Sequence, residues 1–199
     1  GLESITLPFI GASKTAENDY EQVFGYIFGY VKVNNQTHYD GATFQYGYYI
    51  FNQYGPSYYG ACYHYWIPNS LKTVVITNVT NINNYAFNNC SKLTNITLPD
   101  GLKEIERNAF SNCTSLKNIT IPDGVTRIGS DAFSGCSSLM SVTIPDSIAK
   151  IGSDAFSDCN ALIYNEYGNG CYLGSDKNKC VVFVKSKSKN LTSCSVNEK

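Results

Sequence analysis

The sequence is poor in the residues that usually build catalytic or nucleic-acid-binding sites. Among 199 residues there are only two histidines, one methionine and one tryptophan, and charged residues make up 16%. The formal net charge is -1, so the clustered basic surplus that phosphate binding needs is missing. A histidine-dependent nucleophilic site could use only His38 or His64. We therefore expect no enzyme, no cofactor or metal, and no nucleic-acid partner.

Long apolar runs and a leader segment are also missing. No apolar stretch reaches the roughly 18 to 20 residues that span a bilayer. The start has no basic segment followed by an apolar one, so we expect no signal peptide in it. The chain opens with Gly1-Leu2, and Leu2 is already in phase with the repeat described next. We expect a fragment of a longer protein, with its targeting and anchoring signals outside this sequence.

What the sequence does contain is a 23-residue repeat. Four cysteines stand 23 residues apart, and each closes the phrase Ala-Phe-x-x-Cys. The apolar positions of one unit are Leu93, Ile96, Leu98, Leu102, Ile105, Ala109, Phe110 and Cys113. A fixed period of this length is typical of a solenoid, in which each turn buries its apolar face against its neighbours. The pattern predicts a mainly β, right-handed solenoid.

Each unit is predicted to contain two short strands and a compact turn. Leu-x-x-Ile-x-Leu alternates as a strand does and ends at proline, which cannot donate to a strand ladder. A second short strand carries Leu102 and Ile105, and residues 107–113 are too short for more than one helical turn or a 3₁₀ bend. The outward strand positions are expected at Thr97, Thr120 and Thr143.

Two inward columns should run through the repeats. One is a thiol column and the other an aromatic column: Cys90, Cys113, Cys136 and Cys159 with Phe87, Phe110, Phe133 and Phe156. Parallel side chains on stacked turns do not reach disulfide geometry without backbone movement, so free buried thiols are expected. Zinc binding is the alternative, but no Cys-x-x-Cys pair or histidine cluster accompanies these thiols.

The repeat divides the chain into four segments. These are a first repeat strand (1–8), an aromatic-rich insertion (9–70), four regular repeats (71–161), and an irregular repeat with a β-hairpin and the start of a further repeat (162–199). The insertion should contain one short helix of about 10 to 14 residues that begins near Ser13 or Thr15. In the hairpin, a two-residue turn at Ser175-Asp176 would set Cys171 opposite Cys180, as a disulfide or as two free thiols.

The insertion carries the candidate ligand-binding residues. Its residues 39–66 are rich in tyrosine, glycine and amides, a composition that is typical of binding loops. The candidates are Tyr46, Tyr48, Tyr49, Tyr54, Tyr58, Tyr59, Tyr63, Tyr65 and Trp66. A strand through residues 46–51 would divide them into a buried and an outward subset. The alternative is that they form the insertion's own core and cap the solenoid.

The unit Leu-x-x-Ile-x-Leu-Pro, continued to Ala-Phe-x-x-Cys, resembles the BspA-like (treponemal) leucine-rich repeat of bacterial surface proteins. The resemblance is strong over residues 71–161 and weaker over 2–8 and 191–196. It implies a leucine-rich-repeat solenoid and a non-catalytic, extracellular or cell-surface module for adhesion or host-protein binding. The ligand would be a protein or a glycan, without membrane insertion. Alternatives are a carbohydrate-binding module that uses the insertion and a purely structural stalk.

Overall fold

The computed structural model describes residues 1–11, 24–28, 30–32, 42–47, 63–145, 147–162, 165–167, 170–173, 181–185 and 191–196. Within these ranges the only helix is the 3₁₀ helix η2 (Phe24–Phe28), and the other regular elements are strands. The chain is therefore mainly β, as its repeat predicts.

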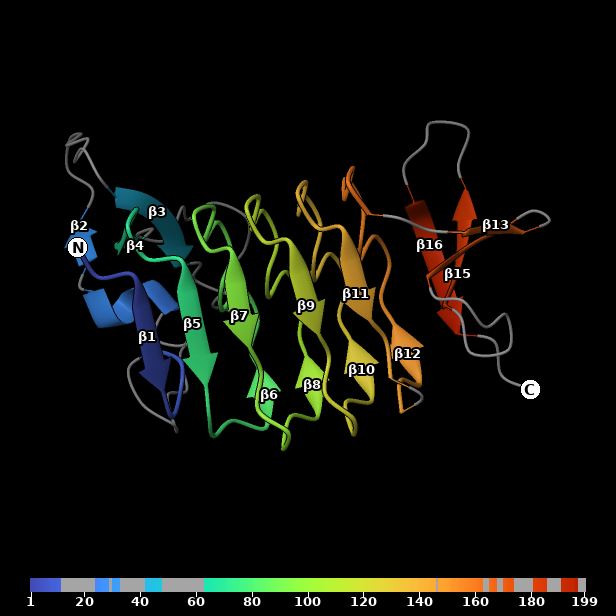
Figure 1. The fold of residues 1–199 in the computed structure, drawn as a ribbon, viewed down its shortest axis with the longest axis horizontal. Coiled ribbons are helices and arrows are strands. Elements are labelled where there is room, and N and C mark those ends of the chain that lie inside the picture. Colours follow the sequence, from blue (N-terminus) through green and yellow to red (C-terminus); the bar gives the residue numbers. More distant parts are fainter. Residues whose placement is uncertain are drawn as a thin grey trace, which may run out of the picture.

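One long side of the molecule is a row of parallel strands, called here the first sheet (Figure 1). Its members are β1 (Ser4–Leu7), β5 (Thr73–Ile76), β7 (Asn95–Thr97), β9 (Asn118–Thr120) and β11 (Ser141–Thr143). β1 pairs with β5, β5 with β7, and β9 with β11, while β7 and β9 are in contact. Asn118 pairs with Ser141, so adjacent turns are offset by one 23-residue period.

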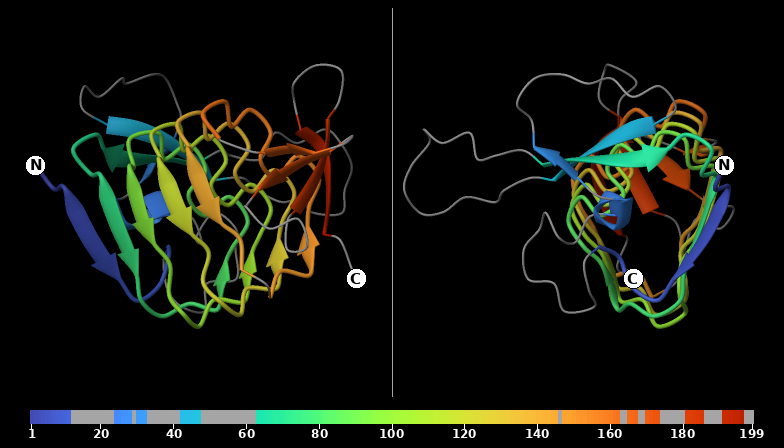
Figure 2. Two further views of the ribbon diagram at one scale, coloured as in Figure 1. Left: turned by 45° about the vertical axis from the view of Figure 1, so that its right-hand side comes forward. Right: turned by 90° about the vertical axis from the view of Figure 1, so that its left-hand side faces the viewer.

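A second row of parallel strands, the second sheet, runs along the opposite side of the core (Figure 2). It consists of β6 (Asn81–Ile82), β8 (Glu104–Ile105), β10 (Arg127–Ile128) and β12 (Lys150–Ile151), paired in that order. In β8, β10 and β12 the isoleucine is buried, and the residue before it is half-buried in β8 and exposed in β10 and β12. Each turn of the chain thus contributes one strand to each sheet and encloses apolar side chains between them.

Both predicted columns are present in the core. The four phenylalanines of the repeats are at most 1% exposed, and their rings stack in parallel with centroids 5.1 to 5.3 Å apart. The four cysteines of the repeats are free and buried. The expected thiol and aromatic columns are therefore confirmed for Cys90, Cys113, Cys136 and Cys159 and for Phe87, Phe110, Phe133 and Phe156.

The segment that joins the second sheet to the next repeat of the solenoid consists of consecutive tight backbone turns. The N–H of Ala109 donates to the carbonyl of Glu106, and the N–H of Cys113 donates to that of Phe110, both three residues back. Asn108 and Asn112 have left-handed backbones, with φ of 55° and 60°. Because a left-handed residue interrupts a right-handed helix, the expected bend forms without becoming a helix.

The insertion forms a small antiparallel sheet with strand order β2-β4-β3. Its strands are β2 (Tyr30–Lys32), β3 (Ala42–Gly47) and β4 (Tyr63–Pro68). The predicted helix start near Ser13 or Thr15 lies outside the described residues, and η2 follows it as a single 3₁₀ turn. The predicted strand over 46–51 shares only Tyr46 and Gly47 with β3, and residues 48–51 lie outside the described part of the chain.

The C-terminal part forms a four-stranded antiparallel sheet. Its strands are β13 (Asn165–Tyr167), β14 (Gly170–Leu173), β15 (Val181–Lys185) and β16 (Leu191–Val196), and β16 also contacts β12 of the solenoid. Cys171 lies opposite Phe183, so the prediction that a two-residue turn sets Cys171 opposite Cys180 was wrong. Leu173 pairs with Val181, which makes the connection longer, and the alternating pattern of these strands fits more than one register.

Candidate binding surfaces

One buried glutamine attaches the insertion sheet to the solenoid. Gln45 on β3 lies opposite Tyr65 on β4, and they are 0% and 1% exposed. The Oε1 of Gln45 accepts a hydrogen bond from the N–H of Gly25 in η2. Its Nε2 donates to the carbonyls of Ala86 at 2.8 Å and Tyr85 at 3.3 Å. A buried, fully bonded amide of this kind fixes the geometry of the elements that it joins.

Phe24 extends the phenylalanine column beyond Phe87. It occupies the place of a repeat phenylalanine in the first repeat, which has no Ala-Phe-x-x-Cys of its own. Its N–H donates to the carbonyl of Ala86 at 2.7 Å, just as the N–H of Phe87 donates to that of Ala109 at 2.7 Å. Its ring packs on Phe87 with centroids 5.0 Å apart, and Phe24 is 0% exposed. The repeat offsets missed this residue because no Ala-Phe-x-x-Cys surrounds it. The only signal was the apolar composition of the segment around it.

The structure describes four of the nine predicted ligand-contacting residues. Tyr65 is buried on the inner face of the insertion sheet, whereas Trp66 is half-buried. Tyr46 and Tyr63 belong to β3 and β4. Because side chains alternate along a strand and Tyr46 pairs with His64, the positions of Tyr46, His64 and Trp66 lie on the face opposite to Tyr65. The others lie outside the described residues: Tyr48, Tyr49, Tyr54, Tyr58 and Tyr59.

The outward face of the first sheet is uncharged and, apart from Val75, polar. Thr97 and Thr120 are exposed, as predicted for the outward strand positions. Neither side chain is among the hydrogen-bonded groups of the described residues, whereas Ser141 donates to the Oδ1 of Asn118 at 2.8 Å. The outward residues of this face are Ser4, Thr6, Thr73, Val75, Asn95, Thr97, Asn118, Thr120 and Ser141.

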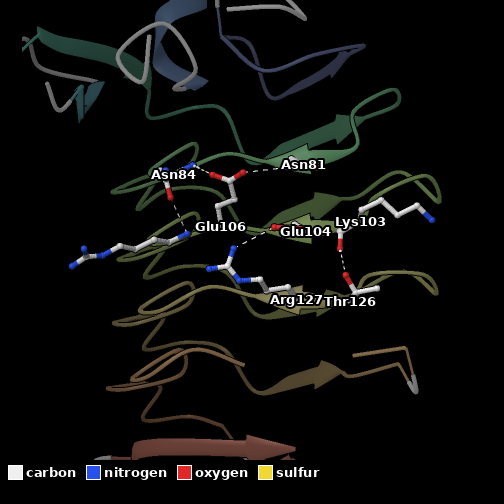
Figure 3. Close-up of polar contacts among 8 residues, drawn as sticks. Asn81, Asn84, Lys103, Glu104, Glu106, Thr126 and Arg127 are labelled. Atoms are coloured by element: carbon white, nitrogen blue, oxygen red, sulfur yellow. Dashed lines mark hydrogen bonds and ion pairs between the residues drawn. The ribbon is translucent and has the colours of Figure 1, made fainter. Parts of the chain in front are cut away.

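The outward face of the second sheet is charged, and its polar groups are paired (Figure 3). Arg127 lies 3.3 Å from Glu104 across adjacent strands. The carboxylate of Glu106 accepts hydrogen bonds from the Nδ2 of Asn81 and the N–H of Asn84, both at 3.2 Å. Exposed ion pairs such as Arg127–Glu104 contribute little stability. These paired side chains join neighbouring turns.

The thiols are protonated and held inside the core. The Sγ atoms of three of them donate at 3.1 Å to the carbonyl of a phenylalanine in the preceding turn, in the pairs Cys113–Phe87, Cys136–Phe110 and Cys159–Phe133. Burial raises the pKa of Cys90 and Cys113. The hydrogen bond with the Cys113 thiol, followed by burial, raises the pKa of Cys136. A buried neutral thiol is a poor nucleophile, so these residues serve packing.

Among the described residues, no three His, Cys, Asp or Glu side chains lie close enough together to hold a metal ion. No helix in these ranges is long and apolar enough to cross a membrane.

Comparison with known proteins identifies the repeat. The family model of the BspA type leucine rich repeat region matches residues 61–173 in six copies. A leucine-rich repeat protein of Treponema pallidum is 47% identical over 47% of this chain and 44% of its own, with a TM-score of 0.46. A leucine-rich repeat protein of Bacteroides ovatus is 39% identical over 47% of this chain and 24% of its own, with a TM-score of 0.46.

A leucine rich cell surface protein of Faecalibacterium prausnitzii is 34% identical over 54% of this chain and 38% of its own, with a TM-score of 0.42. The matches thus span less than half the length of each of these three structures. No curated protein shows a significant match. Because the family model covers more than half of the sequence, the chain belongs to the BspA-type leucine-rich repeat family.

Proposed function

We propose that this chain is a non-catalytic binding module displayed outside a bacterial cell, and that the outward aromatic residues of its insertion contact the ligand. Membership of the BspA-type family suggests a protein-interaction module, and leucine-rich-repeat proteins are generally non-catalytic. The extracellular location is part of this proposal and is supported by the resemblance of the repeat to that of bacterial surface proteins.

The observation that carries this proposal is the attachment of the insertion sheet through its inner face. Gln45, Tyr65 and Phe24 are at most 1% exposed and satisfy the packing and hydrogen bonding between insertion and solenoid. The opposite face of β3 and β4 carries the positions of Tyr46, His64 and Trp66. Binding through this face would use a support that the inner-face contacts hold rigid, which lowers the entropy cost of binding.

The composition of the insertion suggests what kind of ligand it binds. Between residues 39 and 66, Asp40 is the only residue with a full charge. Binding would therefore depend on apolar contact, aromatic stacking and neutral hydrogen bonds. A protein surface with exposed apolar groups fits this chemistry best. A neutral glycan is the second candidate, because tyrosine and tryptophan rings also stack on sugar faces.

The proposal is tested by a binding screen with matched variants of the full chain. The wild type is applied to arrays of host extracellular proteins and of neutral and charged glycans. We expect the triple variant Tyr46→Ser, His64→Ser, Trp66→Ser to bind the ligand found at least about tenfold more weakly, because aromatic anchors dominate interface energies. The double variant Thr97→Ser, Thr120→Ser on the first sheet should bind as the wild type does.

Thermal unfolding of each variant separates lost binding from lost folding, and Tyr46→Ser alone replaces the triple variant if the latter unfolds. Equal binding by wild type and outer-face variants would exclude the insertion as the binding surface. Absence of any ligand on both arrays would favour the structural stalk, and glycan hits alone would favour the carbohydrate-binding module.

A further inference from the structure

The side-chain amide of Gln45 supplies a hydrogen bond that the regular repeats make within their own backbone. In the repeats, the residue after the phenylalanine donates its N–H to the backbone carbonyl three residues back, as Asn88 does to Tyr85 at 3.0 Å. Gly25 is the residue after Phe24, and its N–H donates to the Oε1 of Gln45. A side chain from β3 thus acts as the acceptor for the turn at η2.

The other end of the same amide binds the first of the regular repeats. The Nε2 of Gln45 donates at 2.8 Å to the carbonyl of Ala86, which also accepts the N–H of Phe24 at 2.7 Å. It donates at 3.3 Å to the carbonyl of Tyr85 as well. Hydrogen bonds need defined distances and angles, whereas apolar contacts do not. This buried amide therefore selects one orientation of β3 on the solenoid.

Close packing between η2 and β4 restricts that orientation further. Tyr65, opposite Gln45 on β4, is 1% exposed, and its ring centroid lies 5.8 Å from that of Tyr26. A Cβ placed on Gly25 would lie 2.4 Å from the Cβ of Tyr65 and 2.9 Å from the Oε1 of Gln45. Since even one methyl group has no room there, β4 cannot move closer to η2. A shift of β3 by one residue would turn Gln45 away from its partners.

We infer that Gln45 is the positioning residue of the binding face proposed above. Its amide holds β3 and β4 in one orientation, called here the docked state, so that the positions of Tyr46, His64 and Trp66 move with the repeats as one rigid body. The consequence for binding rests on the proposed function, whereas the rigidity does not. If only a fraction of the molecules is docked, the apparent Kd is the intrinsic Kd divided by that fraction. Gln45 thus sets the affinity of a face on which it does not itself lie.

The test is Gln45→Met in the full chain, which keeps the length of the side chain and removes its amide. Hydrogen–deuterium exchange, followed by NMR, compares the N–H of Phe24, bonded to Ala86, with that of Phe110, bonded to Ala132 at the same 2.7 Å. Unpaired buried groups destabilise the docked state, so Phe24 should exchange at least about tenfold faster than in the wild type. Phe110 should exchange as in the wild type.

Trp66 is the only tryptophan in the sequence and reports the outward face without a ligand. Time-resolved fluorescence anisotropy should show an additional fast component in Gln45→Met, because the sheet then moves relative to the repeats. The matched control is Asn88→Ser, which removes another buried amide, 5% exposed, and introduces the residue type of the equivalent Ser111. It should leave both the exchange of Phe24 and the anisotropy of Trp66 unchanged.

The results separate positioning from a general contribution to stability. Unchanged exchange of Phe24 in Gln45→Met overturns the inference. Equal acceleration of Phe24 and Phe110, or unfolding of the whole chain, also overturns it, because Gln45 would then support the entire fold. Binding to the arrays described above separates the inference from the proposed function. If Trp66 becomes mobile while Gln45→Met binds as the wild type does, Gln45 positions this face and the face is not the binding surface.

Discussion

The thiols of Cys113, Cys136 and Cys159 each share their acceptor, a phenylalanine carbonyl, with a backbone N–H. The carbonyl of Phe110 accepts both the thiol of Cys136 at 3.1 Å and the N–H of Cys113 at 3.2 Å. The sequence could predict that these cysteines are buried and unbridged, because they recur at one inward offset. It could not predict the acceptor, because the direction of this carbonyl depends on the left-handed turn that precedes the cysteine.

The carbonyl of Phe110 lowers the free-energy cost of replacing Cys136 by a polar residue. Cys136→Ser buries a hydroxyl, which costs roughly 1–3 kcal/mol when it has no partner. The Phe110 carbonyl can accept the hydroxyl proton, so we expect a loss of about 1 kcal/mol in urea unfolding. Cys136→Ala, which adds no polar group, is the control. A loss well above about 3 kcal/mol would mean that the hydroxyl does not reach the carbonyl.

The phenylalanine column should contribute more than the thiols. Phe133 is 0% exposed and stacks between Phe110 and Phe156, with centroids 5.2 and 5.1 Å away. Truncation leaves a large void between turns, so Phe133→Ala should cost about 3–5 kcal/mol in denaturant unfolding. Met140→Ala, at a position that is 44% exposed, should change stability by no more than about 0.5 kcal/mol. Similar losses for the two variants would contradict this account of the column.

At the scale of elements, the repeat pattern predicted the strands more accurately than the turns. The alternation of Asn95, Ile96 and Thr97 predicts both strand and face, since the side-chain period of a strand is two. The 23-residue period then sets the register between turns. No such period applies to β14 and β15, where alternation alone allows several registers, and there Cys171 lies opposite Phe183.

The turns depend on two left-handed positions in each repeat. The second of them is occupied by Asn112 (φ 60°), and its equivalents in the next two repeats are Gly135 (φ 73°) and Asp158 (φ 57°). These residue types tolerate this region, whereas a Cβ-bearing apolar residue there is strained by roughly 1–2 kcal/mol. The sequence records this requirement as a preference for Asn, Asp and Gly at these offsets, with Tyr85 (φ 60°) as the exception.

Substitution of one such residue tests the requirement. Asn112→Ala should lose about 1 kcal/mol of unfolding free energy, because alanine is strained at this backbone conformation. Asn112→Gly should change it by less than about 0.5 kcal/mol, since glycine adopts the conformation freely and already occupies the equivalent position 135. Both values can be read from urea unfolding. Equal losses would show that the asparagine side chain, and not the backbone, is what the turn needs.

At the scale of the whole molecule, the attachment of the insertion could not be predicted from the sequence. Gln45 bonds to Gly25 and Ala86, which lie 20 and 41 residues away along the chain. Phe24 joins the aromatic column from outside the repeat pattern. Neither a propensity nor a period connects such distant residues, so only the composition of the insertion was informative. The solenoid itself was predictable because each turn contacts its neighbours by one constant offset.

The buried thiols make the stability of the whole molecule depend on alkaline pH. Burial raises the pKa of Cys90, and the pKa values of the other three column thiols are also raised. The unfolded chain therefore loses these protons above about pH 8.5, while the native chain keeps them. The native state binds more protons in that range, so stability is full below about pH 8.5 and falls as the pH rises further.

Each thiol should contribute a slope of about 1.4 kcal/mol per pH unit once the pH is above the pKa of the unfolded thiol. Urea unfolding of the wild type and of Cys90→Ala between pH 7.5 and 10 isolates one thiol, because the two proteins differ in that group alone. We expect the two curves of unfolding free energy to be parallel at the neutral end. Above about pH 8.5 the wild type should fall more steeply, by one thiol's slope. Curves that stay parallel to pH 10 would mean that Cys90 ionises in the native protein as easily as in the unfolded chain.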